Sequence, residues 1–76
     1  MLSRPKLVVH LKALRIAAKL TQAELAERVG VARKTINTVE NGVFIPSTLL
    51  ALQIAEALAI PIADVFQLDR SSSSDE

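Results

Sequence analysis

Polar side chains that could contact nucleic acid recur at helical spacing within residues 21–42, TQAELAERVGVARKTINTVENG. At about 100° per residue, Ile36 and Val39 face one side of a helix and a polar group faces the other. This polar group comprises Lys34, Asn37, Thr38 and Asn41, with Arg33 beside it in the first turn. Base edges in the major groove present acceptors and donors that such side chains can meet. An ordinary solvated helix would look the same, so the face alone leaves both interpretations open.

The residues before this helix indicate how it is positioned. Thr21 and Glu24 have the spacing of a capping box, in which the hydroxyl caps an early backbone N–H and the carboxylate reaches back to the cap. We therefore expect a helix to begin at Gln22 and to bury the apolar residues that follow at helical spacing. Gly30 can take the positive φ needed to leave that helix. The sequence thus predicts a helix, a tight turn and a second helix.

Charge is segregated along the chain. Residues 1–38 carry eight basic side chains against two acidic ones, a net of +6, and residues 39–76 carry one against six, a net of −5. The formal net charge of +1 therefore hides a dipolar molecule. A basic region around the polar helix would attract phosphates, and much of the affinity for DNA is this salt-dependent contribution. The charge pattern favours a DNA-reading helix over a merely solvated one.

The spacing of residues 22–47, QAELAERVGVARKTINTVENGVFIPS, resembles the Cro and phage-repressor helix-turn-helix family. The likeness extends over residues 8–67. The positions that match the family pattern are Gln22, Leu25, Ala26, Gly30, Ile36, Asn37, Glu40, Gly42, Pro46 and Ser47. The likeness implies an all-α fold, a compact bundle of five short helices whose third helix enters the major groove. It also implies a homodimer on a pseudo-palindromic operator with half-sites about one helical turn apart.

The resemblance also implies roles for individual residues. The family's base-reading positions correspond to Arg33, Lys34, Asn37 and Thr38. Its phosphate-contacting positions correspond to Thr21, Gln22, Thr35 and Asn41. For Gln22 there is independent support, because a helix N-terminus presents free N–H groups to a phosphate. Arg15 and Glu40 match a pair that ties the first helix to the third, and we favour an internal salt bridge over direct DNA contact.

Two departures from the family pattern concern helix ends. Ala32 stands where many members have a capping Ser or Thr, so the third helix should lack a side-chain cap. Lys19 and Ala59 stand where helices of the family often end in glycine or asparagine. We therefore expect those two ends to close by another geometry.

A third departure is the apolar run Val-Phe-Ile at residues 43–45, where relatives often place basic or polar residues. This run argues against phosphate contacts from that loop. We expect Phe44 to fill the core. Any apolar residue of 43–49 that stays exposed would indicate a surface for a protein partner.

The rest of the chain supplies the other elements. The first helix should span about residues 10–18, the fourth should begin near 46–47, and the fifth should be a single turn over 61–66. Residues 6–9 are rich in β-branched side chains and can pair as a strand with residues 65–68. The alternative is that residues 6–9 merely extend the first helix.

Terminal strands of this kind build the dimer in a subgroup that the chain resembles, the cytolysin-repressor type. We therefore predict a homodimer through apolar residues near the two chain ends: Leu7, Val9, Phe66 and Leu68. A lone domain of this size is marginally stable, which favours dimerisation. The rival dimer surface is the apolar loop with Leu49. Along the chain we expect an N-terminal arm able to form a strand (1–9), the DNA-binding domain (10–68) and a disordered polar tail (69–76).

Composition excludes several function classes. The 76 residues contain no cysteine and one histidine, His10, so we expect His10 to be a capping or surface residue and we expect no metal site. We find no Gly-rich phosphate loop, no Ser/His/Asp arrangement and no close carboxylate pair, so we expect neither an enzyme nor a cofactor or small-molecule ligand. Charged residues interrupt every apolar run, which predicts a cytoplasmic protein without a transmembrane segment or signal peptide.

The sequence therefore predicts a sequence-specific transcriptional regulator, most simply a repressor that binds double-stranded DNA as a homodimer. A phage switch protein, an antitoxin that regulates its own operon and a restriction-modification controller share this fold, and the sequence does not separate them. The alternative is a protein-interaction module or antitoxin that uses the apolar surface of residues 43–49 and binds DNA weakly.

Overall fold

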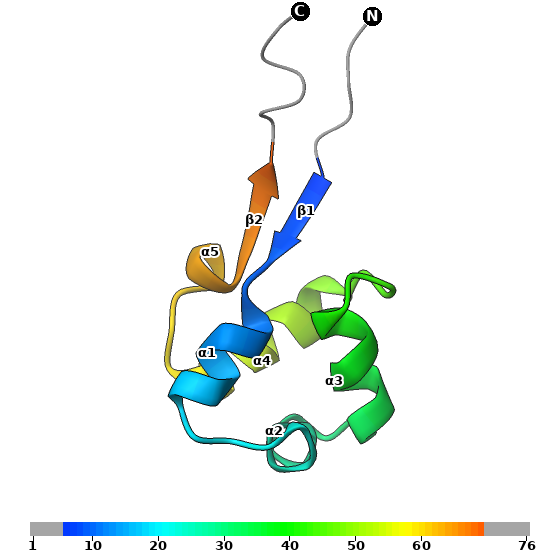
Figure 1. Ribbon diagram of the computed structural model, residues 1–76, viewed down its shortest axis with the longest axis vertical. Helices are drawn as coiled ribbons and strands as arrows, with labels where there is room; N and C mark the ends of the chain where they lie inside the picture. The colour runs from blue at the N-terminus through cyan, green and yellow to red at the C-terminus, as the bar shows by residue number, and fades with distance from the viewer. Residues whose placement is uncertain (1–5, 70–76) are drawn as a thin grey trace, which may run out of the picture.

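The computed structural model describes residues 6–69. The elements follow in the order β1 (Lys6–Val9), α1 (Leu11–Ala17), α2 (Gln22–Val29), α3 (Arg33–Glu40), α4 (Thr48–Leu58), α5 (Ile62–Val65) and β2 (Phe66–Asp69). The helices form one body, and the two strands leave it side by side as a ribbon, with α2 at the opposite end (Figure 1). The predicted bundle of five short helices with terminal strands is confirmed.

One hydrophobic core joins all five helices. Its largest fully buried side chains are Leu11 of α1, Leu25 of α2, Ile36 and Val39 of α3, Ile54 of α4 and Val65 of α5. The two buried residues of α3 are three positions apart and lie on one side of that helix. Because protein interiors are close-packed, this burial fixes the direction in which the opposite side of α3 faces.

The turn between α2 and α3 forms as the sequence predicts. The backbone N–H of Glu24 donates to Thr21 Oγ1 at 3.0 Å, and the backbone N–H of Thr21 donates to Glu24 Oε1 at 2.8 Å, which completes the capping box. Gly30 ends α2 in the left-handed conformation with a φ of 84°. Ala32 precedes α3 without a side-chain cap. The helix-turn-helix unit therefore depends on one strong cap and one glycine.

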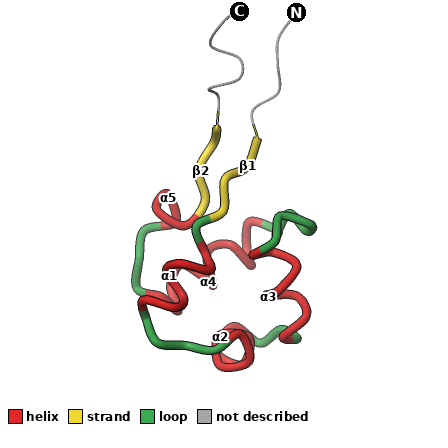
Figure 2. Tube along the Cα trace, viewed as in Figure 1, coloured by secondary structure: helices red, strands yellow, loops and turns green. Residues whose placement is uncertain are grey.

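The strand interpretation of residues 6–9 is also confirmed. β1 and β2 pair antiparallel, with Leu7 opposite Leu68 and Val9 opposite Phe66. Directly paired residues share a face and alternate residues return to it, so these four apolar side chains lie on one face of the ribbon. We call it the apolar ribbon face. Figure 2 shows that both strands extend beyond the helices.

The element ends differ slightly from those expected. The helix expected over 10–18 is α1, Leu11–Ala17, and the strand expected to pair over 65–68 is β2, Phe66–Asp69. Asp69, which we assigned to the polar tail, thus lies in a strand. The rest of that tail and residues 1–5 of the N-terminal arm lie outside the described residues. No helix within residues 6–69 is long and apolar enough to span a membrane.

His10 connects the ribbon to the helical body. Its backbone N–H donates to the Val65 carbonyl at 2.9 Å, and its Nε2 lies 3.0 Å from Gln67 Oε1. The side chain makes no capping bond to α1 and is exposed. Of the two roles expected for His10, the structure therefore shows the surface one.

The expectation that α1 and α4 close by another geometry is wrong. Lys19 and Ala59 adopt the left-handed conformation, with φ of 62° and 57°. The next residue donates its N–H back across each turn, Leu20 to the Arg15 carbonyl and Ile60 to the Ala55 carbonyl, both at 3.1 Å. These are the bonds of a Schellman motif, which requires the left-handed residue. Both ends therefore keep the geometry that glycine would favour, without glycine.

The expectation that Phe44 fills the core is also wrong, because 46% of this residue is exposed. The backbone N–H groups of Val43 and Phe44 both donate to the Thr38 carbonyl, at 2.9 and 3.2 Å. These bonds hold the loop against the end of α3 instead of folding it over the core. Apolar residues of the loop and of early α4 are exposed too: Val43, Ile45 and Leu49.

We predict that Ala59→Gly stabilises the protein. An L-residue in the left-handed region is strained by about 1 to 2 kcal/mol, and glycine relieves this strain while adding roughly 0.4 to 1 kcal/mol of unfolded-state freedom. The free energy of unfolding in urea should rise by about 0.5 to 1 kcal/mol. Ala57→Gly inside α4 is the matched control, and it should destabilise by about 1 kcal/mol. A loss of stability in Ala59→Gly would contradict the strained cap.

Candidate nucleic-acid interface

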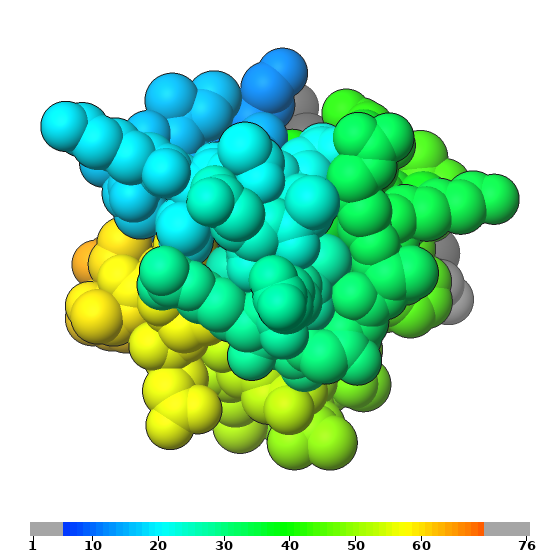
Figure 3. Space-filling view, turned by 90° about the horizontal axis from the view of Figure 1, so that it is seen from below, coloured from blue at the N-terminus to red at the C-terminus, as the bar shows by residue number. Residues whose placement is uncertain are grey.

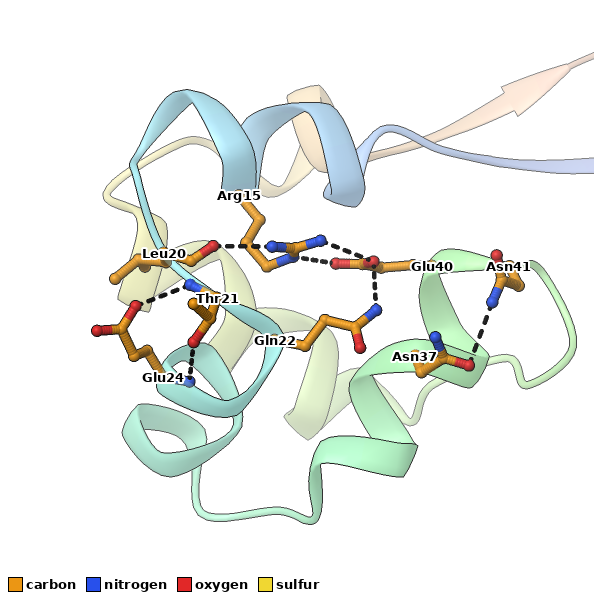
Figure 4. Close-up of polar contacts among 8 residues, drawn as sticks. All are labelled: Arg15, Leu20, Thr21, Gln22, Glu24, Asn37, Glu40 and Asn41. Atoms are coloured by element: carbon orange, nitrogen blue, oxygen red, sulfur yellow. Dashed lines mark hydrogen bonds and ion pairs between the residues drawn. The ribbon is translucent and has the colours of Figure 1, made fainter.

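A buried ion pair connects the first and third helices. Arg15 Nε donates to Glu40 Oε2 at 2.5 Å, and Arg15 Nη2 donates to Oε1 at 3.3 Å (Figure 4). The Arg15 side chain is 10% exposed and that of Glu40 is 1% exposed. Arg15 Nη1 also donates to the Leu20 carbonyl at 2.8 Å. The pair is internal and spans α1 and α3, so neither side chain faces outward as a DNA contact would require.

Gln22 brings the second helix into the same network. Its Nε2 donates to Glu40 Oε1 at 3.0 Å, so a side chain from the first turn of α2 contacts the last residue of α3. Figure 4 shows the Arg15 and Gln22 side chains reaching the Glu40 carboxylate from different helices. Three helices thus meet at one carboxylate. The orientation of α3 against α2 depends on it.

The outward side of α3 is polar, as the sequence predicts. Arg33, Lys34 and Asn37 are exposed on the helix, and Asn41 is exposed just after it. Asn41 Nδ2 donates to Asn37 Oδ1 at 3.2 Å, which links the two amides one helical turn apart. Two cations and two amides are therefore available to a ligand on this side of the helix.

The two threonines of α3 lie on the side facing the following loop. Thr35 and Thr38 are half-buried, and Thr38 Oγ1 donates to the Thr35 carbonyl at 2.9 Å. The hydroxyl proton of Thr38 is thus used within the helix. Thr38 can offer an approaching base its methyl group and its oxygen acceptor, but not its donor.

The predicted phosphate contacts Thr21 and Gln22 lie at the N-terminus of α2, where each already has an internal partner. The Thr21 side chain belongs to the capping box, and half-buried Gln22 donates to Glu40. The backbone N–H of Thr21 stabilises the charged carboxylate of Glu24, so the pKa of Glu24 is lowered from its ordinary value. Thr21 itself is exposed. Figure 3 views the molecule from the end opposite the ribbon and shows α2 in the middle of that end, with α3 beside it.

The sequence did not predict an apolar hollow beside α3. Ala32, Lys34, Thr35, Thr38, Val43 and Phe44 line it. The signal for it was the apolar run at residues 43–45. The sequence predicts Phe44 in the core and a protein-partner surface at any exposed apolar residue of this region. The hollow instead adjoins two of the predicted base-reading residues, Lys34 and Thr38.

A five-helix bundle that fixes its third helix through a buried network and presents that helix's polar side outward is a helix-turn-helix DNA-binding domain. The chain belongs to the helix-turn-helix family of the Cro and phage-repressor type, whose model matches residues 11–65. Proteins of this family are DNA-binding transcriptional regulators.

Two curated relatives are similar over most of their length. An uncharacterized transcriptional regulator of this type, YgzD of Bacillus subtilis, is 41% identical over 61 residues, which cover 80% of this chain and 92% of the relative. Another uncharacterized regulator, from Methanothermobacter thermautotrophicus, is 53% identical over 55 residues, covering 71% of this chain and 80% of the relative. The likeness therefore extends to both bacteria and archaea.

Solved structures with the same fold are regulators too. The restriction-modification controller protein C.AhdI of Aeromonas hydrophila is 35% identical with a TM-score of 0.69, covering 71% of this chain and 82% of that one. The clp gene regulator ClgR of Corynebacterium glutamicum is 30% identical with a TM-score of 0.69, covering 71% of this chain and 57% of that one. The helix-turn-helix architecture described above is thus shared with known regulators.

We predict that Glu40→Ala destabilises the protein by about 3 to 5 kcal/mol, because it leaves the buried Arg15 guanidinium without its carboxylate. In a double-mutant cycle, Arg15→Met combined with Glu40→Leu should cost clearly less than the sum of Arg15→Met alone and Glu40→Leu alone. Urea unfolding of wild type, these two single variants and the double variant measures the coupling.

Asn41→Ala is the control for this experiment. It removes an exposed amide pair next to Glu40, and its effect should stay within about 0.5 kcal/mol. If Glu40→Ala costs no more than Asn41→Ala, the buried network does not stabilise the bundle.

Proposed function

We propose that this chain is a sequence-specific transcriptional repressor that binds a pseudo-palindromic operator as a homodimer. The observation that carries the proposal is the polar, cation-bearing outward side of α3, held in direction by the network at Glu40. A helix of this kind fits the major groove, where base edges offer partners to amides and cations. Occupying a promoter is the simplest way for such a small domain to regulate transcription.

We assign base reading to Arg33, Lys34, Asn37 and Thr38. Lysine or arginine pairs well with guanine and asparagine with adenine. Phosphate contacts are assigned to Thr21, Gln22, Thr35 and Asn41. For Gln22 the assignment is supported by its position at the helix N-terminus, since the amide that donates to Glu40 retains a second N–H for a phosphate. Phosphate contact through Gln22 would thus connect DNA directly to the buried network.

We assign the dimer contact to the apolar ribbon face, formed by Leu7, Val9, Phe66 and Leu68. Two grooves support this assignment. The first, which we call the ribbon groove, is lined by Lys6, Leu7, Val9, Gly42, Phe44 and Ile45. The second contains Leu7, Ile45, Pro46, Ile62 and Phe66. The ribbon face and Ile45 of the loop, which the sequence treated as rival dimer surfaces, are therefore neighbours, and a second copy of the chain could cover both.

One observation favours a different function. Val43, Ile45 and Leu49 are all mostly exposed and lie within seven residues of one another along the chain, and exposed apolar residues that form one patch mark protein-interaction sites. A protein-interaction module or antitoxin would use this surface for another protein and would bind DNA weakly. That alternative would be favoured if titration with DNA showed no binding and the chain formed a tight complex with such a protein.

We predict that Lys34→Ala and Asn37→Ala each weaken operator binding by about 1 to 3 kcal/mol and relax the preference at particular base pairs. Thr21→Ala should weaken binding to all sequences more evenly, because a phosphate contact carries no sequence information. Operator duplexes with single base-pair changes, titrated with each variant, separate the two behaviours. Unchanged affinity and unchanged preference in both Lys34→Ala and Asn37→Ala would exclude α3 as the reading helix.

We predict that Leu7→Lys combined with Leu68→Glu converts the dimer to a monomer. The two residues face each other across the ribbon, so opposite charges should preserve strand pairing while removing the apolar contact. Operator affinity should then fall by about 100-fold or more, because the two half-sites are no longer bound together. Analytical ultracentrifugation at micromolar concentrations reports the oligomeric state directly.

Ile16→Asp serves as the control for the dimer experiment, because Ile16 is an exposed apolar residue of α1 outside both grooves. It should leave the dimer intact. A wild-type protein that sediments as a monomer, or a double variant that remains a dimer, would contradict the assigned contact.

A further inference from the structure

The apolar hollow beside α3 belongs to the same surface as the proposed DNA contact. It measures about 450 Å³, is open to solvent, and takes part of its wall from three residues of α3: Lys34, Thr35 and Thr38. Lys34 and Thr38 are among the residues to which we assign base reading. A base pair approaching α3 would therefore meet this hollow as well as the polar side chains around it.

The loop residues of the hollow are held in place by the backbone. Gly42 turns the chain with a φ of 74°, and the N–H groups of Val43 and Phe44 then donate to the Thr38 carbonyl. Val43 is 77% exposed, so the core makes little use of it. Phe44 lines both this hollow and the ribbon groove, whereas Val43 lines the hollow but not the ribbon groove. Val43 is thus an apolar side chain fixed beside the reading helix.

The wall of the hollow suits hydrocarbon rather than phosphate. Val43, Phe44 and Ala32 offer only hydrocarbon side chains, and the hydroxyl proton of Thr38 is already donated to the Thr35 carbonyl. The polar groups left for a phosphate are the Lys34 ammonium and the hydroxyl of Thr35, to which we assign a phosphate contact, and the rest of the wall is hydrocarbon. The apolar group that DNA presents in the major groove is the 5-methyl of thymine, which proteins meet with small apolar side chains, threonine methyls or phenylalanine.

We propose that this hollow receives the 5-methyl group of a thymine in each half-site, and that Val43 determines the preference for thymine at that position. The inference rests on the proposed function, because it requires α3 to lie in the major groove. It gives this loop an apolar, base-specific contact with DNA.

The test begins by selecting random duplexes on the purified protein. The strongest site is then synthesised again with each thymine replaced in turn by deoxyuridine, which lacks only the 5-methyl group. At one position in each half-site the replacement should weaken wild-type binding by about 4-fold, the effect of burying one methyl group. For Val43→Ala the same replacement should have little effect. Leu52→Ala, which alters an exposed apolar residue of α4 outside the hollow, should behave like wild type.

Two results would overturn the inference while leaving the proposed function intact. One is a selected site at which no deoxyuridine replacement weakens wild-type binding. The other is a replacement that weakens wild type and Val43→Ala by the same factor, which would mean that a residue other than Val43 meets the methyl group. If selection enriches no sequence from a folded protein, the proposed function itself fails and the inference fails with it.

Discussion

A buried carboxylate is the constraint on which the rest of this structure depends. Removing the Glu40 side chain from water is unfavourable unless cations and donors surround it, and α1 and α2 supply them through Arg15 and Gln22. A hydrophobic core alone permits adjacent helices to slide or rotate at small cost, whereas this network requires one arrangement of three helices. The same arrangement determines where the polar side of α3 faces. Stability and the geometry of the proposed DNA contact therefore share one interaction.

Two kinds of surface meet around α3. Its outward side carries cations and amides, while the loop after it carries apolar side chains held to Thr38 by backbone hydrogen bonds. The loop lies between α3 and the ribbon groove, and Phe44 contributes to the hollows on both sides. A contact with DNA and a contact with a second subunit would thus be made by neighbouring residues.

The family resemblance implied the five-helix fold, and local features of the sequence predicted several of its details. The Thr21 to Glu24 capping box and Gly30 each act within a few residues, so the start and end of α2 could be read from the sequence. The helical spacing of Ile36 and Val39 likewise predicted which side of α3 is buried. The β1 and β2 pairing was predicted from the β-branched residues at 6–9 together with the resemblance to a subgroup that has terminal strands, and the alternative was that residues 6–9 extend α1.

The errors arose where distant parts of the chain decide the outcome. Ala59 adopts a left-handed conformation because Ile60 must return to the core after α4, a requirement that no local pattern reveals. Phe44 stays outside because other side chains already fill the core and because the backbone N–H groups of Val43 and Phe44 donate to the Thr38 carbonyl. The partner of Gln22 was also missed, since its contact with Glu40 joins residues 18 positions apart.

If α3, fixed by the network at Glu40, reads DNA sequence as we propose, the affinity of the protein for DNA must depend on that sequence. The most direct test compares a genomic fragment selected by the protein with a shuffled duplex of identical length and composition, titrated over a range of salt concentrations. The selected fragment should bind about 1,000-fold or more tightly than the shuffled one, and both affinities should fall as salt increases. Equal affinity for the two duplexes at every salt concentration would contradict the proposal.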